Sequence, residues 1–311
     1  MRAYLLRRIA GLLPVLAVAV LVTFAAIHAL PGDPVQVMLS DHSADREMAA
    51  RLRAEYGLDQ PLTSQFAAYL GEIARGRFGL SFRYVHTSVA DVLSDSVAIS
   101  PLLALAALSV ALLIGVPAGV QAAIHRNRWP DVTLIVALVA GLSIPNFAIA
   151  TFLVYLLSVR LALLPVAGWG SLAQAVLPVL VLAIPAGAYI ARLTRTFMLE
   201  VLAQDYVRTA RAKGLGRGAV IWQHAFPNTL VPLTTSAGVM LGGLLSQTVV
   251  VETIFNIPGL GRLAIDSVFA RDYPVAMAVV LLFVLFYAGI NLAVDMIAVL
   301  IDPRVRMGQD A

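Results

Sequence analysis

The chain carries one strongly polar stretch between apolar runs, and it reads Asp205-Tyr-Val-Arg-Thr-Ala-Arg-Ala-Lys-Gly-Leu-Gly216. Its residues up to Lys213 are mostly good helix formers. A cation followed by glycine is a common helix end, because glycine adopts the left-handed conformation at little cost. We therefore predict a helix that ends at Gly214.

The stretch continues as Arg217-Gly-Ala-Val-Ile-Trp-Gln-His-Ala-Phe-Pro-Asn228. Residues 219–226 fit a second short helix, with Pro227 as its boundary. The whole segment from Arg192 to Pro232 lies between two apolar runs. It is rich in cations, and only Glu200 and Asp205 offset Arg192, Arg195, Arg208, Arg211, Lys213 and Arg217.

The composition is that of an integral membrane protein. Of the 311 residues, 60% are hydrophobic and 13% are charged, whereas soluble domains average about half and a quarter. The net charge of +4 is carried almost entirely by arginine. With no soluble basic domain, we expect no nucleic acid partner. Cysteine is absent, so disulfides and thiolate metal sites are excluded.

Six apolar runs are long enough to cross the ~30 Å of hydrocarbon in a bilayer. We therefore predict an all-α membrane protein with six transmembrane helices. Its parts are residues 1–30 with the first helix, an outer loop at 31–98, a five-helix core at 99–301 that includes the loop 192–232, and a tail at 302–311. The runs are Ile9–Leu30, Ile99–Ile124, Val132–Leu157, Leu172–Ile190, Val231–Val251 and Val275–Ile301.

Arginine is distributed unevenly between the two sides that six spans define. Both termini and the arginine-rich segment 192–217 lie on one side. The short loops on the opposite side hold three arginines, at 160, 262 and 271. Because positive charge collects on the cytoplasmic side, we expect both termini and the polar loop to be cytoplasmic.

The outer loop predicts two short amphipathic helices. Apolar residues repeat every four positions from Met48 to Tyr56, and a second stripe runs from Phe66 to Ile73. Gly57 and Gly76 follow these patterns and are the expected helix ends. The helices could cover the span ends, face a partner protein, or do both.

Several residues inside the apolar runs could have structural or functional roles. Pro117, Pro145, Pro178 and Pro185 are expected to interrupt the second, third and fourth spans. Gly238 and Gly242-Gly243, after Ala237, predict a small-residue face for close packing within the chain or with another permease.

Charged residues are rare in these runs, and each one is a functional candidate. Glu252 lies at the outer end of the fifth span, where snorkelling to water or a structural role is the preferred interpretation. Asp295 is expected to make a hydrogen bond within or between subunits.

The five histidines, 28, 42, 86, 125 and 224, show no metal-ligand spacing.

An ATP site of the P-loop type is excluded. Lys213 is the only lysine in the chain, and Ala212 rather than glycine precedes it. The G-x-x-x-x-G-K-[ST] loop that cradles phosphates therefore cannot form here.

The spacing of Thr209-Ala210, Gly214 and Pro227 resembles the EAA loop of ABC-importer permeases. Together with His224-x-x-Pro-Asn228, it is similar to the dipeptide/oligopeptide/glutathione/nickel branch, although Arg208 stands where the eponymous glutamate would be. The alternative, a basic loop that only fixes topology and touches anionic lipid, does not require this spacing. The resemblance implies that the loop couples to an ATPase through Asp205, Tyr206, Thr209, Ala210, Lys213, Gly214, Leu215, His224, Pro227 and Asn228.

Further stretches extend the resemblance over almost the whole chain, including 251–261 and 271–274. It implies the type I importer fold in a bacterial inner membrane and a role as half of a peptide pathway. The implied partners are a second permease, two ATPase subunits that hold ATP and Mg, an outer solute-binding protein and membrane lipid. The chain itself would then be no enzyme and hold no cofactor.

Other functions remain open on the sequence. The same kind of importer could carry glutathione or chelated nickel. An ion-driven secondary transporter would need paired repeats or intramembrane acids, and a non-transporting scaffold would need no fixed loop spacing.

Overall fold

The structure is a computed structural model that describes residues 2–29, 35, 39, 46–84 and 86–301. Within these residues the regular elements are helices, apart from one isolated bridge between Leu80 and Ser88. Five helical stretches of the described chain are long and apolar enough to cross a membrane by length and composition, so the all-α membrane fold is confirmed. They are Gly11–His28, Val89–Ile124, Leu172–Leu202, Arg217–Phe255 and Tyr273–Val294.

The chain divides into two compact units. The first unit holds Met1–Ser100 and Pro258–Phe286. Its helices are α1 (Arg2–His28), α3 (Arg46–Glu55), α4 (Leu62–Ala74), α5 (Val89–Ser94), α13 (Leu260–Phe269) and the first half of α14 (Tyr273–Ile301).

The two amphipathic helices predicted in the outer loop are confirmed as α3 and α4. Gly57 and Gly76 follow them with φ angles of 66° and 73°, in the left-handed region that glycine enters without a Cβ penalty. The apolar side of α4 packs Phe66 and Tyr69 against a cluster that includes Phe24 of α1. α4 is thus held by this unit's own core.

A buried carboxylate that the sequence did not single out fixes the chain before α5. Asp272 is 1% exposed and accepts hydrogen bonds from the Ser81 hydroxyl and from the backbone N–H of Phe82 at 3.0 Å. The backbone N–H of Arg83 adds a third at 3.3 Å. Asp272 lies just before α14 and therefore ties the outer segment to the start of that helix.

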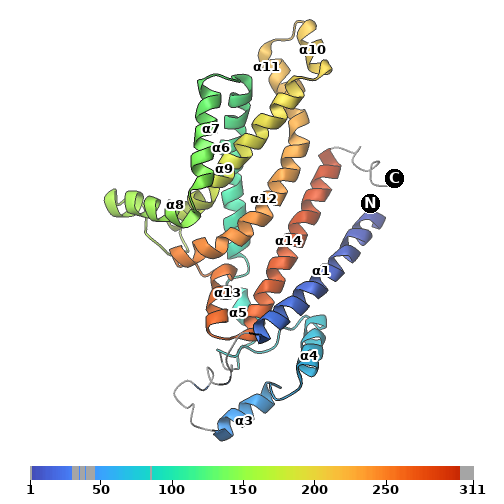
Figure 1. Cartoon of the computed structure of the whole chain (residues 1–311), viewed down its shortest axis with the longest axis vertical. Helices are drawn as coiled ribbons and strands as arrows, with labels where there is room; N and C mark the ends of the chain where they lie inside the picture. The colour runs from blue at the N-terminus through green and yellow to red at the C-terminus, as the bar shows by residue number, and fades with distance from the viewer. Residues whose placement is uncertain (1, 30–34, 36–38, 40–45, 85, 302–311) are drawn as a thin grey trace. The chain divides into compact units, whose positions relative to one another are not determined.

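The second unit holds Pro101–Ile257 and Tyr287–Ala311. Its helices include α6 (Ile99–Ile124), α7 (Trp129–Ser143), α8 (Asn146–Leu153), the π-helical η2 (Val154–Arg160), α9 (Leu172–Leu202) and α12 (Phe226–Phe255). α9 lies in the middle and packs against α7, α8 and α12 (Figure 1).

Glycine permits very close packing of α6 on α9. A Cβ on Gly115 would lie 2.5 Å from the Gly187 carbonyl oxygen, and one on Gly119 would clash with the Ala191 carbonyl. In a membrane, where lipid competes for apolar side chains, such small residues let helix backbones approach and gain van der Waals contact.

The third predicted span is divided, so the prediction of one helix from Val132 to Leu157 is wrong. α7 ends at Ser143, and α8 begins at Asn146 after an extended Ile144 with φ −95° and ψ 121°. Pro145 explains the break, because the residue before a proline is pushed away from helical angles. Pro145 therefore does interrupt its span, as expected.

The other three prolines are tolerated inside continuous helices. Pro117 lies inside α6, and Pro178 and Pro185 lie inside α9. Neighbouring helices and local adjustments can accommodate the missing hydrogen bonds in a membrane helix.

The small-residue face predicted on α12 packs within the chain. A Cβ on Gly238 would clash with the Val294 side chain, and one on Gly242 would clash with the Tyr287 ring, both on α14. Gly243 has open space around it. The first of the two predicted roles, close packing within the chain, is thus confirmed for Gly238 and Gly242.

Glu252 does not reach water, so the snorkelling interpretation is wrong and the structural one remains. Its side chain is 0% exposed. The chain turns at Asn256, a left-handed helix cap, and the Ile257 N–H returns to the Glu252 carbonyl at 2.9 Å. Phe255 and Ile257 are buried with it. The predicted roles of the Asp295 side chain and of the tail 302–311 lie outside the described residues.

Candidate functional site

The polar stretch forms a short helix beyond the end of α9. α10 (Asp205–Ala212) begins after the extended N-cap Gln204. Asp205 lies in its first turn, where a negative charge interacts favourably with the helix dipole. Figure 1 shows α10 and the following α11 (Arg217–Ala219) at the far ends of the long helices of the second unit.

The helix stop predicted at Gly214 is confirmed. Lys213 is the C-cap, and Gly214 has a φ of 78°. The Gly214 N–H donates to the Arg211 carbonyl at 3.0 Å. No atom lies within 4 Å of a Cβ built on Gly214, so the left-handed backbone, rather than a lack of space, favours glycine here.

The predicted separate helix from Ala219 to Phe226 is not observed. α11 continues through the π-helical η3 (Val220–Ala225) into α12, which gives one helical stretch, Arg217–Phe255. Pro227 lies at the start of α12, where the π-helical geometry of η3 gives way to α-helix, and such a local adjustment can accommodate its missing N–H. The proline therefore marks a change of helix geometry and not a helix end. A helix of 39 residues spans roughly 55–60 Å, about twice the hydrocarbon thickness, so it extends out of the membrane.

α10 packs against its own chain through one apolar side. Val207, Ala210 and Val220 form a buried cluster. Ala210 is 5% exposed, so in this chain its side chain packs inward and is not part of an open surface; its predicted role in coupling to an ATPase stays a prediction. The reason for the inward packing is the chain reversal at Gly214, which brings η3 back across α10.

The side of α10 next to this apolar cluster is open. Tyr206 is 44% exposed, and Thr209 and Lys213 are also exposed. Residues three, four and seven positions apart share a helix face, so these three side chains form a mildly polar, cationic surface. Partial burial raises the pKa of Tyr206 above its ordinary value, so the phenol stays protonated at neutral pH and can donate a hydrogen bond.

The remaining predicted residues lie along the path into α12. Leu215 is 39% exposed. His224 is half-buried in η3, and the Asn228 amide donates to its carbonyl at 2.7 Å. Pro227 and Asn228 are exposed in the first turn of α12. The structure thus spreads these residues over α10, its turn and the start of α12.

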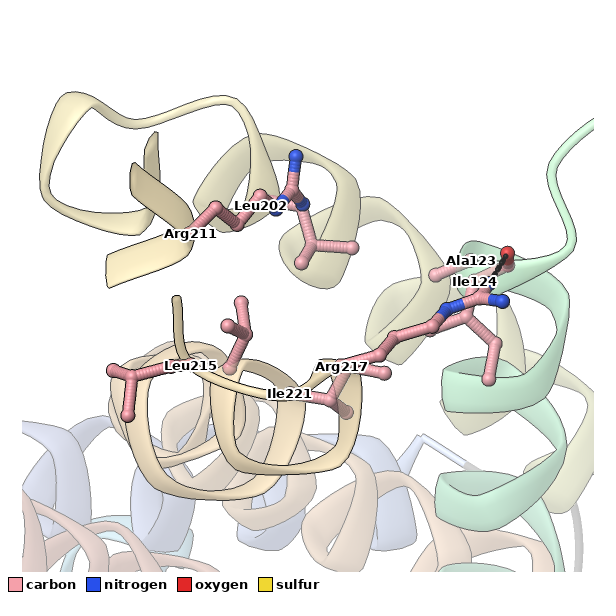
Figure 2. A pocket seen from close by; sticks show the side chains of 8 residues that line it. Ala123, Ile124, Leu202, Arg211, Leu215, Arg217 and Ile221 are labelled. Atoms are coloured by element: carbon pink, nitrogen blue, oxygen red, sulfur yellow. Dashed lines mark hydrogen bonds between the residues drawn. The ribbon is translucent and has the colours of Figure 1, made fainter. Parts of the chain in front are cut away.

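A cavity of about 420 Å³ opens between α9–α10 and α11–η3. Figure 2 shows Arg211 beside Leu202 on one side, and Arg217 with Ile221 on the other. The remaining wall is apolar. Two cations on an apolar surface suit contact with a partner that presents acidic and apolar side chains. The cavity is lined by Ala123, Ile124, Leu202, Arg211, Leu215, Arg217, Val220 and Ile221.

Arg217 attaches this region to the end of α6. Its guanidinium donates to the Ile124 carbonyl at 2.9 Å (Figure 2), and a cation there also interacts favourably with the helix C-terminus. Behind it, Ile221 and Ala225 of η3 are buried with Met198 of α9 and with the end of α6.

A second attachment joins α7 to α9 just before the polar stretch. The Arg195 Nε and Nη2 donate to the two carboxylate oxygens of Asp131, the Nη2 bond being 2.8 Å. The Asp131 side chain is 2% exposed, and it also accepts from the Asn127 N–H at 2.9 Å. The sequence offered one signal for this pair, because Asp131 is the only acidic residue between Asp95 and Glu200.

Among the residues that the structure describes, no group of three potential ligands could hold a metal ion. The geometry provides an exposed helix, α10, whose neighbouring segments are attached to the ends of α6, α7 and α9.

Residues 115–307 match the family described as the inner membrane component of binding-protein-dependent transport systems. Residues 1–98 match the N-terminal part of its membrane component. The chain belongs to this family of ABC-importer permeases.

Its sequence is similar to a more specific group. It is 40% identical over 303 residues to the glutathione transport system permease protein GsiC of Escherichia coli (strain K12). The GsiC of Shigella flexneri serotype 5b (strain 8401) is equally similar. In both cases the match covers 97% of this chain and 98% of the relative. The chain is thus a permease of the dipeptide/oligopeptide/glutathione/nickel branch.

Comparison with solved transporter structures shows the same fold as in this chain. The inward-facing MetNI methionine ABC transporter superposes with a TM-score of 0.59 at 20% identity, covering 68% of this chain and 96% of that one. An amino acid ABC transporter with histidines gives a TM-score of 0.53 at 16% identity, covering 69% and 94%. These likenesses confirm the type I importer permease fold.

Proposed function

We propose that this permease carries short peptides, and that glutathione, a small tripeptide, is among them. The observation that supports the substrate class is the 40% identity, over nearly the full length of both chains, to permeases named for glutathione transport. The alternative within the same class is that the substrate is a di- or oligopeptide other than glutathione.

We further propose that the exposed side of α10 docks on an ATPase subunit. Its small and cationic side chains, Thr209 and Lys213, would enter an acidic groove of that partner. The complete assembly would contain a second permease, two ATPases that bind ATP and Mg, and an outer solute-binding protein. The present chain would supply neither the nucleotide site nor a cofactor.

The attachments of α10 explain how motion could reach the membrane. ATP binding would favour one conformation of the assembly over the other, and hydrolysis would reverse the preference. Because Arg217 holds α6 and the Asp131–Arg195 pair joins α7 to α9, a displacement of α10 would move these helices together rather than bend a flexible loop.

Topology gives the first test. Gly216 and Ser64 are both exposed, and the chain has no cysteine. We expect Gly216→Cys to react with an impermeant thiol reagent only from the cytoplasm, and Ser64→Cys only from outside. The measurement is labelling of intact and opened cells. Labelling of both positions from one side would contradict cytoplasmic termini.

Substrate uptake gives the second test. In vesicles that contain the complete importer, we expect ATP-dependent uptake of labelled glutathione at least tenfold above vesicles lacking the binding protein. Unlabelled dipeptides added in excess would compete if the substrate class is broad, and would not compete if glutathione is preferred. Uptake of neither glutathione nor any di- or oligopeptide would refute the proposed function.

A further inference from the structure

Polar side chains of α8, α9 and α12 lie near one another on an exposed side of the second unit. A cavity of about 200 Å³ opens between α9 and α12. Tyr189 of α9 and Gln247 of α12 supply its polar groups. Its remaining lining residues are Pro185, Ala186, Met240 and Leu244.

Gln247 is held in place by a neighbouring helix. The Asn146 amide at the start of α8 donates to the Gln247 side-chain oxygen at 2.8 Å. Because this bond uses the oxygen of Gln247, its NH₂ group remains a donor for the carbonyl or carboxylate of a ligand. Gln247 is exposed on α12, so the group is accessible from the cavity.

Arg192 places a positive charge on the same side of α9 as Tyr189. Arg192 is three residues beyond Tyr189, and its guanidinium lies 5.3 Å from the centre of the Tyr189 ring. This arrangement is a cation–π contact, which orients the guanidinium. Arg192 is exposed and therefore keeps donors for an anion.

These groups are unfavourable against lipid. An amide and a phenol on helices that span a membrane are costly in hydrocarbon and normally face protein or water. A side of the permease that carries both around a cavity, with Arg192 stacked on the Tyr189 ring, is therefore better suited to a water-filled path than to the bilayer.

We propose that Gln247, Tyr189 and Arg192 form a subsite on the translocation path that binds the amide groups and terminal carboxylate of a short peptide. This inference rests on the proposed function, and it adds the residues that contact the substrate. Gln247 donates to a peptide carbonyl, the Tyr189 ring covers the apolar part, and Arg192 attracts the carboxylate.

The first arm of the test removes the amide. In the complete reconstituted importer, Gln247→Leu keeps a similar size without hydrogen bonds. We expect uptake per ATP hydrolysed to fall about tenfold, whereas ATP hydrolysis stimulated by the binding protein stays within twofold. Gln247→Asn should restore part of the uptake. Thr253→Val, an exposed polar change elsewhere on α12, is the matched control and should behave as the unmodified protein.

The second arm tests the carboxylate. The unmodified importer should prefer a peptide with a free C-terminal carboxylate over the same peptide with a C-terminal amide. Arg192→Gln should reduce this preference at least fivefold in kcat/KM, and Thr253→Val should preserve it.

The outcomes separate this inference from the proposed function. Loss of the second permease from the Gln247→Leu complex would show a subunit interface and overturn the subsite. Unchanged uptake by Gln247→Leu and unchanged preference in Arg192→Gln would also overturn it, while peptide transport by the unmodified importer would leave the proposed function intact. If the unmodified importer moves no peptide, the proposed function itself fails.

Discussion

Asp131→Asn is expected to abolish most ATP-coupled transport and to destabilise the permease measurably. The Asp131 side chain is 2% exposed, and both of its oxygens accept from Arg195, whose side chain is 22% exposed. Removing one partner of a buried pair leaves the other charge uncompensated and costs about 3–5 kcal/mol. Because Arg195 is partly solvated, we expect the lower end of that range.

The measurement is thermal unfolding of the purified complex together with ATP-driven uptake. Glu47→Gln, which breaks an exposed pair with Arg51 in α3, is the matched control and should leave both unchanged. The exchanged pair Asp131→Arg with Arg195→Asp should recover part of the loss. An Asp131→Asn permease with unaltered unfolding and uptake would show that α7 and α9 do not depend on this pair.

Thr209→Trp is expected to release the ATPase subunits while the permease remains in the membrane. Thr209 is exposed on the open side of α10, so tryptophan can be accommodated in the isolated chain. In a fitted groove of a partner, the added volume should cost about 1–3 kcal/mol, which corresponds to a loss of roughly 5- to 150-fold in affinity.

Co-purification of the ATPases with the tagged permease measures this effect. Ala68→Trp, at an exposed position of α4, is the control for the size of the substitution and should retain the ATPases. Ala210→Trp would not be diagnostic, because Ala210 is already buried against Val207 and Val220. Retention of the ATPases by Thr209→Trp would place the docking surface elsewhere.

Local sequence patterns were sufficient to predict the helices and several of their ends. Gly57, Gly76 and Gly214 all adopt the left-handed conformation expected after a helix. The long apolar runs likewise predict helices wherever no residue conflicts with helical geometry. In the third span the pattern failed, because apolar residues continue through Ile144 while Pro145 breaks the backbone.

The periodic pattern of apolar residues could not predict contacts between segments that are far apart in the sequence. The Asp131–Arg195 pair joins residues 64 positions apart, and Ser81 reaches Asp272 across 191 positions. Spacing along α10 puts Tyr206, Thr209 and Ala210 on neighbouring parts of the helix surface, but it does not say which of them packs inward. The reversal at Gly214 decides this, since it places Val220 against Ala210.

A crosslink from Thr209→Cys to an ATPase chain in the complete importer tests directly whether α10 is the coupling helix. The permease has no cysteine of its own, so the introduced thiol is unique within it. A bifunctional reagent should join it to an ATPase chain, and the yield should change when ATP is trapped, because the proposed coupling would move α10 together with that subunit. No crosslink to an ATPase in either state, with uptake preserved, would contradict the assignment of α10 as the coupling helix.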